Sequence, residues 1–508
     1  MARGKSAALL GPWPGGINQR DDPTEISDNE LVDIVNFDVE STGALIPRRG
    51  WQEFNVSAPV QRVVPLTIYY NYLAQPGALF ARYTNIGAGT EQTAFFYILQ
   101  LIYSDLKNNA GVVYTRTGLF ATAFNYDKKV YFVPDNRSQA AGVGFSIDSL
   151  QNQDPVNVAA MPAGRFSFIM ADRAFIFNPD TGRLYWSKAT DPTVWAAPDG
   201  GFVDVEPSDE SFTDCVLVRN TAYFIRSNGI FAFTFTSDPG IDGVVVTLTN
   251  SEGATMGCAY QNELILATPR GIFKFLNGYL TLITDKVILG VVTGPAAYSD
   301  NNGMTVIEHT LWVRAWDGAK VTHLSVNLRT GAVSRYDHTN LSEIYGRSTS
   351  DSKYTYLSTG TKVAAITNQR SATTVTANGK DFGYSFSTKR ITFGTRLIWK
   401  RLVSWLVDYN SGVQFHDGND STKFFVRVGT VGELNQQTTY TGNAKISNDS
   451  KEGRIDTPSL RFKDVQFGMQ SIQAGNNNPN GIAADAGITV RGLLAVYSTS
   501  RETVSLQT

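Results

Sequence analysis

Residues 222–233, with the sequence Ala-Tyr-Phe-Ile-Arg-Ser-Asn-Gly-Ile-Phe-Ala-Phe, contain the pattern that decides the fold. Apolar residues run up to the turn Ser227-Asn228-Gly229 and resume after it, which is typical of two antiparallel strands joined by a tight turn. The same plan recurs in further segments, whose first apolar runs are Val130–Val133, Ala174–Phe177, Leu264–Ala267, Leu311–Val313 and Tyr354–Leu357.

The turns of these segments recur at a nearly constant spacing. Successive turns are 46, 47, 42, 47 and 42 residues apart, counted between Asn136, Gly182, Gly229, Gly271, Gly318 and Gly360. A repeat of about 40 to 50 residues is the size of one four-stranded blade of a β-propeller. The spacing therefore predicts an all-β protein with a six-bladed β-propeller over residues 56–378.

One observation supports the propeller prediction, and there are two alternatives to six blades. Cys215 precedes Gly229 by nearly the same distance as Cys258 precedes Gly271, so the two cysteines occupy matching places in successive repeats and favour packing roles. A seventh blade around Gln75-Pro76-Gly77 is an alternative, but this turn lies too far before the next one to fit the repeat, so six blades are preferred. A β-sandwich array with evenly spaced turns is the other alternative.

Composition narrows the possible functions. The 508 residues include 44 Lys and Arg and 46 Asp and Glu, and 42% are hydrophobic, which excludes a disordered chain. A net charge of -2 argues against a global attraction to DNA or to anionic lipid. The 2 cysteines are too few for a disulfide framework and have the wrong spacing for a structural zinc site. We expect no metal and no cofactor.

Neither a signal peptide nor membrane insertion is expected. The apolar stretch Ala7–Leu10 is shorter than the roughly 7 to 15 residues of a signal peptide. The longest apolar run, Ala94–Tyr103, is interrupted by Gln100 and is too short to span a bilayer.

Residues 1–55 are predicted to form an arm followed by a short helix. Ser27 and Glu30 have the spacing of a helix capping box, and Ile26 and Leu31 occupy the two positions of a hydrophobic staple. This pattern predicts a helix over residues 28–36.

Residues 379–508 are predicted to form a separate C-terminal β-sandwich-like domain. Their apolar and polar residues alternate over longer strands, which are Arg390–Phe393, Leu397–Tyr409, Lys423–Val428, Leu460–Ile472 and Ile488–Tyr497. A basic cluster opens the domain and contains Lys389, Arg390, Arg396, Lys400 and Arg401. A nucleic-acid surface is one interpretation, but a strand with outward charges that face solvent or another subunit is favoured.

Few residues point to catalysis. The four histidines, His309, His323, His338 and His416, lack the spacing of metal ligands, and nucleophile-elbow and phosphate-binding motifs are absent. A propeller glycosidase needs only carboxylates brought together from several blades, and the candidates are Glu206, Asp209, Glu210, Asp214, Glu263 and Glu308. We expect most of them to be structural and the protein not to be an enzyme.

Four passages of the sequence are distinctive. They are Gly15-Gly16-Ile17-Asn18-Gln19-Arg20-Asp21-Asp22-Pro23, Gly43-Ala44-Leu45 with Arg48-Arg49-Gly50, Arg183-Leu184-Tyr185-Trp186-Ser187, and Thr388-Lys389-Arg390-Ile391-Thr392-Phe393-Gly394 with Lys400-Arg401. These passages resemble the tail-nozzle or tail-hub proteins of short-tailed bacteriophages and related minor tail proteins. The likeness extends over most of the chain and is weakest over residues 55–115. The chain is short for a full nozzle.

The resemblance implies a non-enzymatic virion protein, made in the cytoplasm of the host bacterium. Its copies would form a ring in the tail, with a hexamer as the expected state, which joins the connector or tube to distal tail proteins. Phage DNA would pass through the ring without sequence-specific binding. The alternatives on the same fold are a receptor-binding tail-tip adhesin and a polysaccharide depolymerase.

The sequence also suggests assembly residues. In an isolated arm of residues 1–25, Trp13 and Ile17 would be apolar groups exposed to water, so we expect the arm to become ordered on a neighbouring subunit. Arg20, Asp21 and Asp22 would form charge-assisted hydrogen bonds across that contact. Lys389, Arg390 and Arg396 complete the predicted assembly interface.

Overall fold

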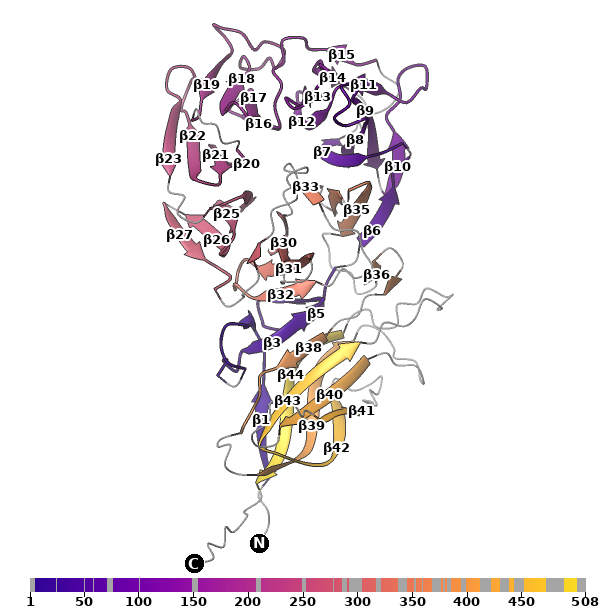
Figure 1. Cartoon of the computed structure of the whole chain (residues 1–508), viewed down its shortest axis with the longest axis vertical. Helices are drawn as coiled ribbons and strands as arrows, with labels where there is room; N and C mark the ends of the chain where they lie inside the picture. Colours follow the sequence, from indigo (N-terminus) through magenta and orange to yellow (C-terminus); the bar gives the residue numbers. More distant parts are fainter. Residues whose placement is uncertain are drawn as a thin grey trace, which may run out of the picture.

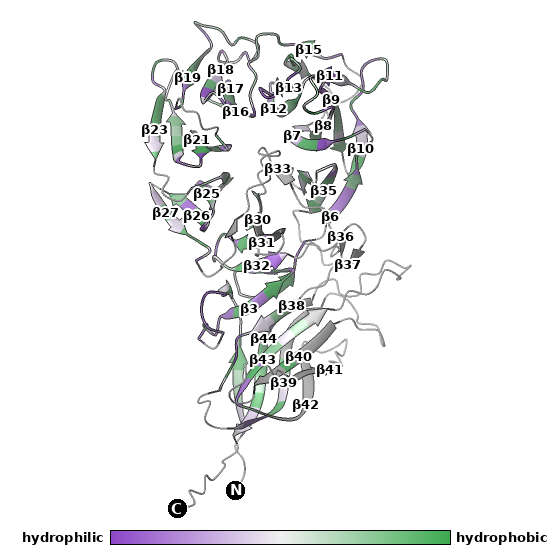
Figure 2. Cartoon of the chain, viewed as in Figure 1, coloured by the Kyte–Doolittle hydropathy of each residue, from purple (hydrophilic) through white to green (hydrophobic). Residues whose placement is uncertain are grey.

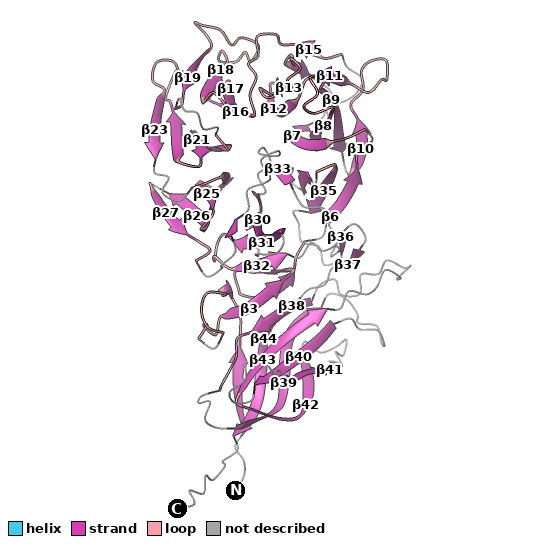
Figure 3. Cartoon of the chain, in the orientation of Figure 1, coloured by secondary structure: helices cyan, strands magenta, loops and turns pink. Residues whose placement is uncertain are grey.

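Over its described residues, the computed structural model consists of β-strands and the loops that join them (Figure 3). It describes residues 5–23, 25–49, 51–57, 59–70, 76–99, 101–148, 154–206, 212–248, 253–276, 278–285, 290–291, 304–316, 321–336, 345–350, 353–358, 360–367, 376–377, 380–381, 385–393, 399–411, 422–429, 438–442, 452–471 and 488–499. A ring of sheets occupies one end of the molecule and a second β body the other (Figure 1).

The described residues contain seven blades, of which the first six are built from successive stretches of the chain. Blade 1 consists of β7 (Arg62–Tyr70), β8 (Pro76–Thr84), β9 (Gln92–Leu99) and β10 (Ile102–Asp105), with β11 (Thr115–Thr117) beside β9. Blade 2 consists of β12 (Phe120–Tyr126), β13 (Lys129–Pro134), β14 (Phe145–Ile147) and β15 (Val156–Asn157). Blade 3 consists of β16 (Phe166–Met170), β17 (Arg173–Asn178), β18 (Arg183–Trp186) and β19 (Gly201–Asp204).

The remaining blades complete the ring. Blade 4 consists of β20 (Asp214–Val218), β21 (Thr221–Arg226), β22 (Gly229–Thr234) and β23 (Val244–Leu248), and blade 5 of β24 (Met256–Tyr260), β25 (Glu263–Thr268), β26 (Gly271–Leu276) and β27 (Tyr279–Leu282). Blade 6 consists of β28 (Gly290–Val291), β29 (Met304–Ile307), β30 (Thr310–Trp316), β31 (Val321–Asn327) and β32 (Val333–Tyr336). Blade 7 consists of β33 (Tyr345–Ser350), β34 (Tyr354–Ser358), β35 (Lys362–Thr367) and β6 (Trp51–Asn55), next to β36 (Thr376–Ala377) and β37 (Lys380–Asp381).

The ring closes through one strand of each blade, which is its first strand except in blade 6, where it is β29. Each contacts the next, in the order β7, β12, β16, β20, β24, β29 and β33, and β33 contacts β7. The outer strand of blade 7 comes from the N-terminal side of the propeller, because β6 pairs antiparallel with β35. Blade 7 therefore joins both ends of the propeller segment, which keeps the ring closed.

The β-propeller is confirmed, but the preferred count of six blades is wrong and the alternative of seven is right. The sequence pattern marks the hairpin between the second and third strands of a blade. In blade 1 this is the β8–β9 turn around Gly87, whose distance from Asn136 is close to the length of the repeat. Pro76 and Gly77 instead begin β8, so the spacing measured from them compared different hairpins. The turn at Gly318 lies outside the described residues, although β30 and β31 flank it.

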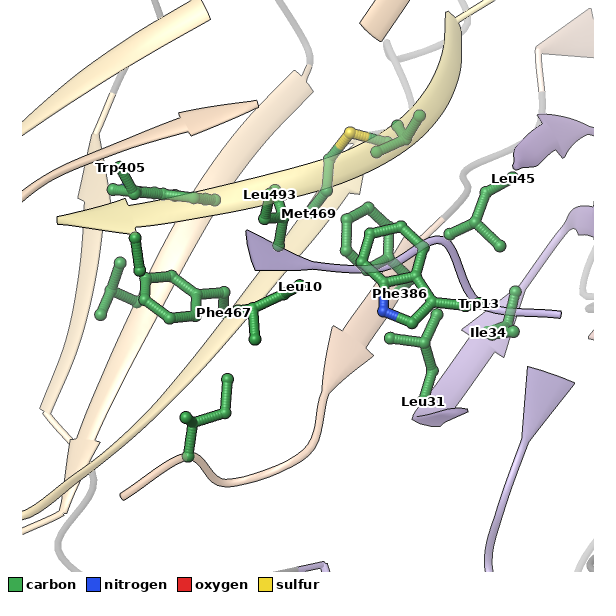
Figure 4. Close-up of a cluster of buried hydrophobic side chains, with 14 of the residues drawn as sticks. Leu10, Trp13, Leu31, Ile34, Leu45, Phe386, Trp405, Phe467, Met469 and Leu493 are labelled. Atoms are coloured by element: carbon green, nitrogen blue, oxygen red, sulfur yellow. The ribbon is translucent and has the colours of Figure 1, made fainter. Parts of the chain in front are cut away.

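The second body is a sandwich of two sheets, built from both ends of the chain. The first sandwich sheet contains β1 (Lys5–Leu10), β4 (Phe37–Val39), β5 (Leu45–Pro47), β39 (Lys400–Ser411), β42 (Glu452–Phe462) and β44 (Ile488–Thr499). The second sandwich sheet contains β2 (Gly16–Ile17), β3 (Glu30–Val35), β38 (Ser385–Thr388), β40 (Thr422–Gly429), β41 (Thr438–Gly442) and β43 (Asp464–Ser471). Figure 4 shows their shared core, in which Trp405 and Leu493 of the first sheet lie near Phe467 and Met469 of the second.

Residues 1–55 do not form the separate arm-and-helix unit that the sequence suggested. Residues 5–47 supply strands to both sandwich sheets, and residues 51–55 supply the outer strand of blade 7. The second sandwich sheet is also continuous with blade 6, because β32 pairs in parallel with β2 and β3. The propeller and the sandwich therefore share one hydrogen-bonded sheet.

The predicted helix over residues 28–36 is wrong, since Glu30–Val35 forms β3. One half of the capping box is present, because the Ser27 N–H donates to the Glu30 carboxylate at 3.4 Å. The misleading signal comes from a β-bulge between Leu31 and Asp33, where the pairing with β38 shifts register. The bulge places Leu31 and Ile34 in the same core, and their spacing of three residues imitates one face of a helix.

Candidate assembly surfaces

The charged loop, defined as residues 18–29 between β2 and β3, contains three of the predicted assembly residues. Arg20, Asp21 and Asp22 are all exposed. The buried Asn18 side chain organises the loop by donating to Asp21 at 2.8 Å and to Glu30 at 2.7 Å. Its amide oxygen also accepts the N–H groups of Arg20 and Asp21 at 3.1 and 3.2 Å. The loop is hydrophilic (Figure 2).

Two of the predicted basic residues meet this same loop from the other end of the chain. The Lys389 ammonium donates to the carbonyl of Ile26 at 2.9 Å and pairs with Asp28. The Arg390 N–H donates to the carbonyl of Pro23 at 2.9 Å. The structure therefore brings together five of the eight predicted assembly residues around one loop. Arg396 lies outside the described residues.

Trp13 and Ile17 do not have the predicted role. Each is 1% exposed, and both lie in the sandwich core. The Trp13 and Phe386 ring centroids are 5.5 Å apart. Figure 4 shows the two side chains next to each other. The prediction that residues 1–25 need a neighbouring subunit to cover these side chains is wrong, because strands from residues 385–499 cover them within the same chain.

The charged loop also reaches the propeller. Arg20 donates to the carbonyl of Asp285, just after β27 of blade 5, at 3.3 Å. A second connection lies at blade 6, where the buried Asp38 carboxylate accepts the Ser325 hydroxyl at 2.6 Å and the Tyr336 hydroxyl. Arg335 of β32 pairs with Asp33 at 2.6 Å. Because buried hydrogen-bonded groups resist displacement, the sandwich and propeller are held in one orientation.

Sequence reasoning missed the outer rim of the propeller. The fourth strands of blades 2 to 5 are sheet edges that expose apolar side chains, which are Val156, Phe202, Val244, Val246 and Tyr279. Unpaired strand edges with apolar side chains are typical contact surfaces. The available signal was the short apolar run that follows each recurring hairpin, such as Val244–Leu248.

Three of the six candidate carboxylates have structural partners. Asp214 is 1% exposed and accepts the N–H groups of Cys215 and Gly257, both at 2.8 Å. Glu263 pairs with Lys274 at 2.7 Å, and Glu308 pairs with Arg49 at 2.6 Å. Glu206 lies just after β19 with its backbone against Gly182. Asp209 and Glu210 lie outside the described residues.

The other reactive groups are also used in packing. Cys215 and Cys258 occupy the first strands of blades 4 and 5, and burial raises the pKa of the Cys258 thiol. His309 Nδ1 lies 2.9 Å from the Tyr260 hydroxyl, across blades 5 and 6, whereas His338 and His416 lie outside the described residues. In the part of the chain that the structure describes, no group of three His, Cys, Asp or Glu residues could hold a metal ion.

The basic side chains at the start of the C-terminal domain differ in their exposure to solvent. Arg401 is exposed, as expected for an outward charge, but Lys400 is 2% exposed, contrary to that expectation. Burial lowers the pKa of Lys400.

The described residues include no helix with the length and hydrophobicity that a membrane span requires.

Comparison with known proteins gives similarities of fold only. No family model matches the chain, and no curated protein sequence matches it. Among solved structures, BamB from Moraxella catarrhalis is 13% identical, with a TM-score of 0.34, and the match covers 62% of this chain and 99% of BamB. A protein of unknown function from Desulfotomaculum acetoxidans is 12% identical, with a TM-score of 0.37 and coverage of 57% and 90% of the two chains.

The dihydro-heme d1 dehydrogenase NirN is 11% identical, with a TM-score of 0.35, and the match covers 66% of this chain and 65% of NirN. We draw no functional conclusion from similarities of this size. The assignment of a propeller rests on the seven sheets themselves and on the contacts that close the ring.

Proposed function

We propose that this chain is a non-enzymatic structural protein of a bacteriophage tail, with its copies arranged in a nozzle or hub ring. The observation that carries the proposal is the meeting of two sequence passages that resemble tail proteins. Residues 15–23 and 388–393 are far apart in the chain, yet the Arg390 N–H donates to the Pro23 carbonyl at 2.9 Å. Lys389 is held by Ile26 and Asp28 of the same loop.

These contacts give the shared passages a mechanical role. They fix an exposed charged loop to the sandwich, and Arg20 links that loop to blade 5. A structural protein that transmits force between tail components requires contacts that hold its sandwich and propeller together, and it does not require reactive groups. Three of the candidate carboxylates, Asp214, Glu263 and Glu308, are bound to structural partners, which also favours a scaffold over a depolymerase.

Cryo-electron microscopy of virions tests the proposal. The chain has a recognisable outline, with a seven-bladed ring at one end and a sandwich at the other, so it can be located directly in the density. We expect several copies in a ring on the tail axis, between the connector or tube and the distal tail proteins. A position on a peripheral fibre, or absence from the virion, would contradict the proposal.

A biochemical assay addresses the enzymatic alternative. Purified protein incubated with bacterial capsule or cell-wall polysaccharide should release no reducing ends. Release that disappears on replacement of one or two propeller carboxylates would identify a depolymerase instead.

A further inference from the structure

The first sandwich sheet has two faces, of which one forms the sandwich core. Leu10, Leu402, Trp405, Leu493 and Ala495 lie in that core. Because successive side chains of a strand point to opposite sides, their immediate neighbours in β1, β39 and β44 lie on the outer face, which is directed away from the second sandwich sheet.

The strand register shows how this outer face is built. Leu9, Leu494 and Leu406 form one row across the three strands, and Ala7, Val496 and Ser404 form the next. Lys5, Ser498 and Arg401 form a third row. The face is therefore an apolar surface with a basic end, and Leu9 at its margin is 70% exposed.

The sequence of β44 indicates that this face is covered in the working protein. Leu493-Leu494-Ala495-Val496 is apolar without alternation, as in a strand that is buried on both sides. Within the described residues β1 pairs only with β44, so its other edge is open. The opposite edge strand, β42, contains Pro458 and shifts register with β39, features that discourage pairing with another strand.

The outer face carries two basic side chains, and acidic side chains predominate in the charged loop. Lys5 and Arg401 are exposed, and neither makes an ion pair with a described residue. The exposed part of the loop contains Arg20 with Asp21, Asp22, Glu25 and Asp28. Lys389 pairs with Asp28 and Arg390 lies beside Pro23, so the four acidic groups exceed the basic groups at the loop by one. The loop leads into β3 of the second sandwich sheet, whereas the outer face points away from that sheet.

We propose that the outer face of the first sandwich sheet binds the charged loop of a second copy of this chain. The apolar rows would provide buried area, and the basic row would select the acidic loop. Two different surfaces on each copy make a head-to-tail contact, which closes into a ring when the rotation between copies allows it. The inference rests on the proposed function, because it supplies the contact by which the proposed ring assembles.

Charge reversal followed by mixing tests this pairing. The variant Lys5→Glu with Arg401→Glu makes the face acidic, and Asp21→Lys with Glu25→Lys makes the loop basic. Self-association of the full chain is measured by sedimentation velocity and light scattering, and folding by circular dichroism. The matched control, Lys107→Glu with Lys129→Glu, reverses two exposed lysines on the propeller.

We expect the wild type and the control to assemble alike, and each reversed variant to weaken self-association by about tenfold or more. An equimolar mixture of the two reversed variants should assemble again, because each acidic face then meets a basic loop. Leu9→Gln should weaken assembly without affecting folding, because its side chain is 70% exposed.

The outcomes separate this inference from the proposed function. A wild type that assembles while both reversed variants assemble equally well overturns the inference alone, as does a mixture that fails to recover. A wild type that is monomeric in solution and absent from virions overturns both proposals. The inference is also overturned if the Lys5→Glu, Arg401→Glu variant assembles normally but no longer binds duplex DNA that the wild type binds. The face would then be a nucleic-acid surface.

Discussion

The Asp214 carboxylate accepts a hydrogen bond from the backbone N–H of Gly257 at 2.8 Å, and this contact joins the first strands of blades 4 and 5. The same carboxylate accepts the N–H of Cys215 at 2.8 Å. Asp214, a candidate catalytic carboxylate in the sequence, therefore holds two neighbouring blades together. Buried acceptors of this kind stabilise a structure mainly because their loss leaves donors unpaired.

Replacing Asp214 with Ala should destabilise the propeller by about 1 to 3 kcal/mol, since the Gly257 N–H would lose its partner in a buried site. Urea unfolding monitored by tryptophan fluorescence measures the change. Asp204→Ala is the control, because Asp204 forms an exposed pair with Arg183 at 2.8 Å and should contribute less than about 1 kcal/mol. Equal effects of the two substitutions would contradict the role assigned to Asp214.

Trp13→Ala should destabilise the sandwich by about 3 to 5 kcal/mol, because it removes a large side chain that is 1% exposed from the core. Thermal unfolding followed by near-ultraviolet circular dichroism is the measurement. Leu9→Ala, four residues earlier and 70% exposed, should change stability by less than about 0.5 kcal/mol. If Trp13→Ala were harmless, the N-terminal segment would have to leave the sandwich in solution.

The loop between β22 and β23 should keep its structure in mild acid. Hydrogen bonds from the Thr236 hydroxyl, and then from Ser237 and the Asp238 N–H, hold the pKa of Asp242 at about 2. Because the folded-state pKa is lowered, the carboxylate contributes stability above the unfolded value of about 4, and this contribution disappears as pH falls through about 2. The stability difference between wild type and Asp242→Asn should therefore shrink between these pH values, as measured by urea unfolding at several pH values.

A fragment of residues 51–367 should be more stable than one of residues 56–378, although the second contains the whole predicted propeller domain. Only the first retains β6, which pairs with β35 and buries Phe54 at 8% exposure. Loss of Phe54 alone should cost about 3 kcal/mol or more. Limited proteolysis and thermal unfolding compare the fragments, and equal resistance would show that β6 is dispensable.

Local patterns in the sequence predicted much of the propeller. The hairpins around Gly182 and Gly229 follow from apolar runs on either side of a turn, and these interactions are close in sequence. The same reasoning found six of the seven blades. It also located Lys389 and Arg390 as assembly candidates, but it could not show that they meet the charged loop, because Lys389 and Ile26 are 363 residues apart.

By itself, the sequence determined that the chain is all-β, that its strands form repeated hairpins, and that neither metal nor nucleophile motifs are present. Only the tertiary structure decided that residues 30–35 are a strand, that β6 closes blade 7, and that Trp13 is buried in its own chain. The physical reason is that hairpin turns depend on neighbouring residues, whereas Leu31, Phe54 and Trp13 acquire their environment from partners hundreds of residues away. A local pattern such as the Ser27–Glu30 contact fits a helix or a bulged strand equally well, and the available pairing partner, β38, selects the strand.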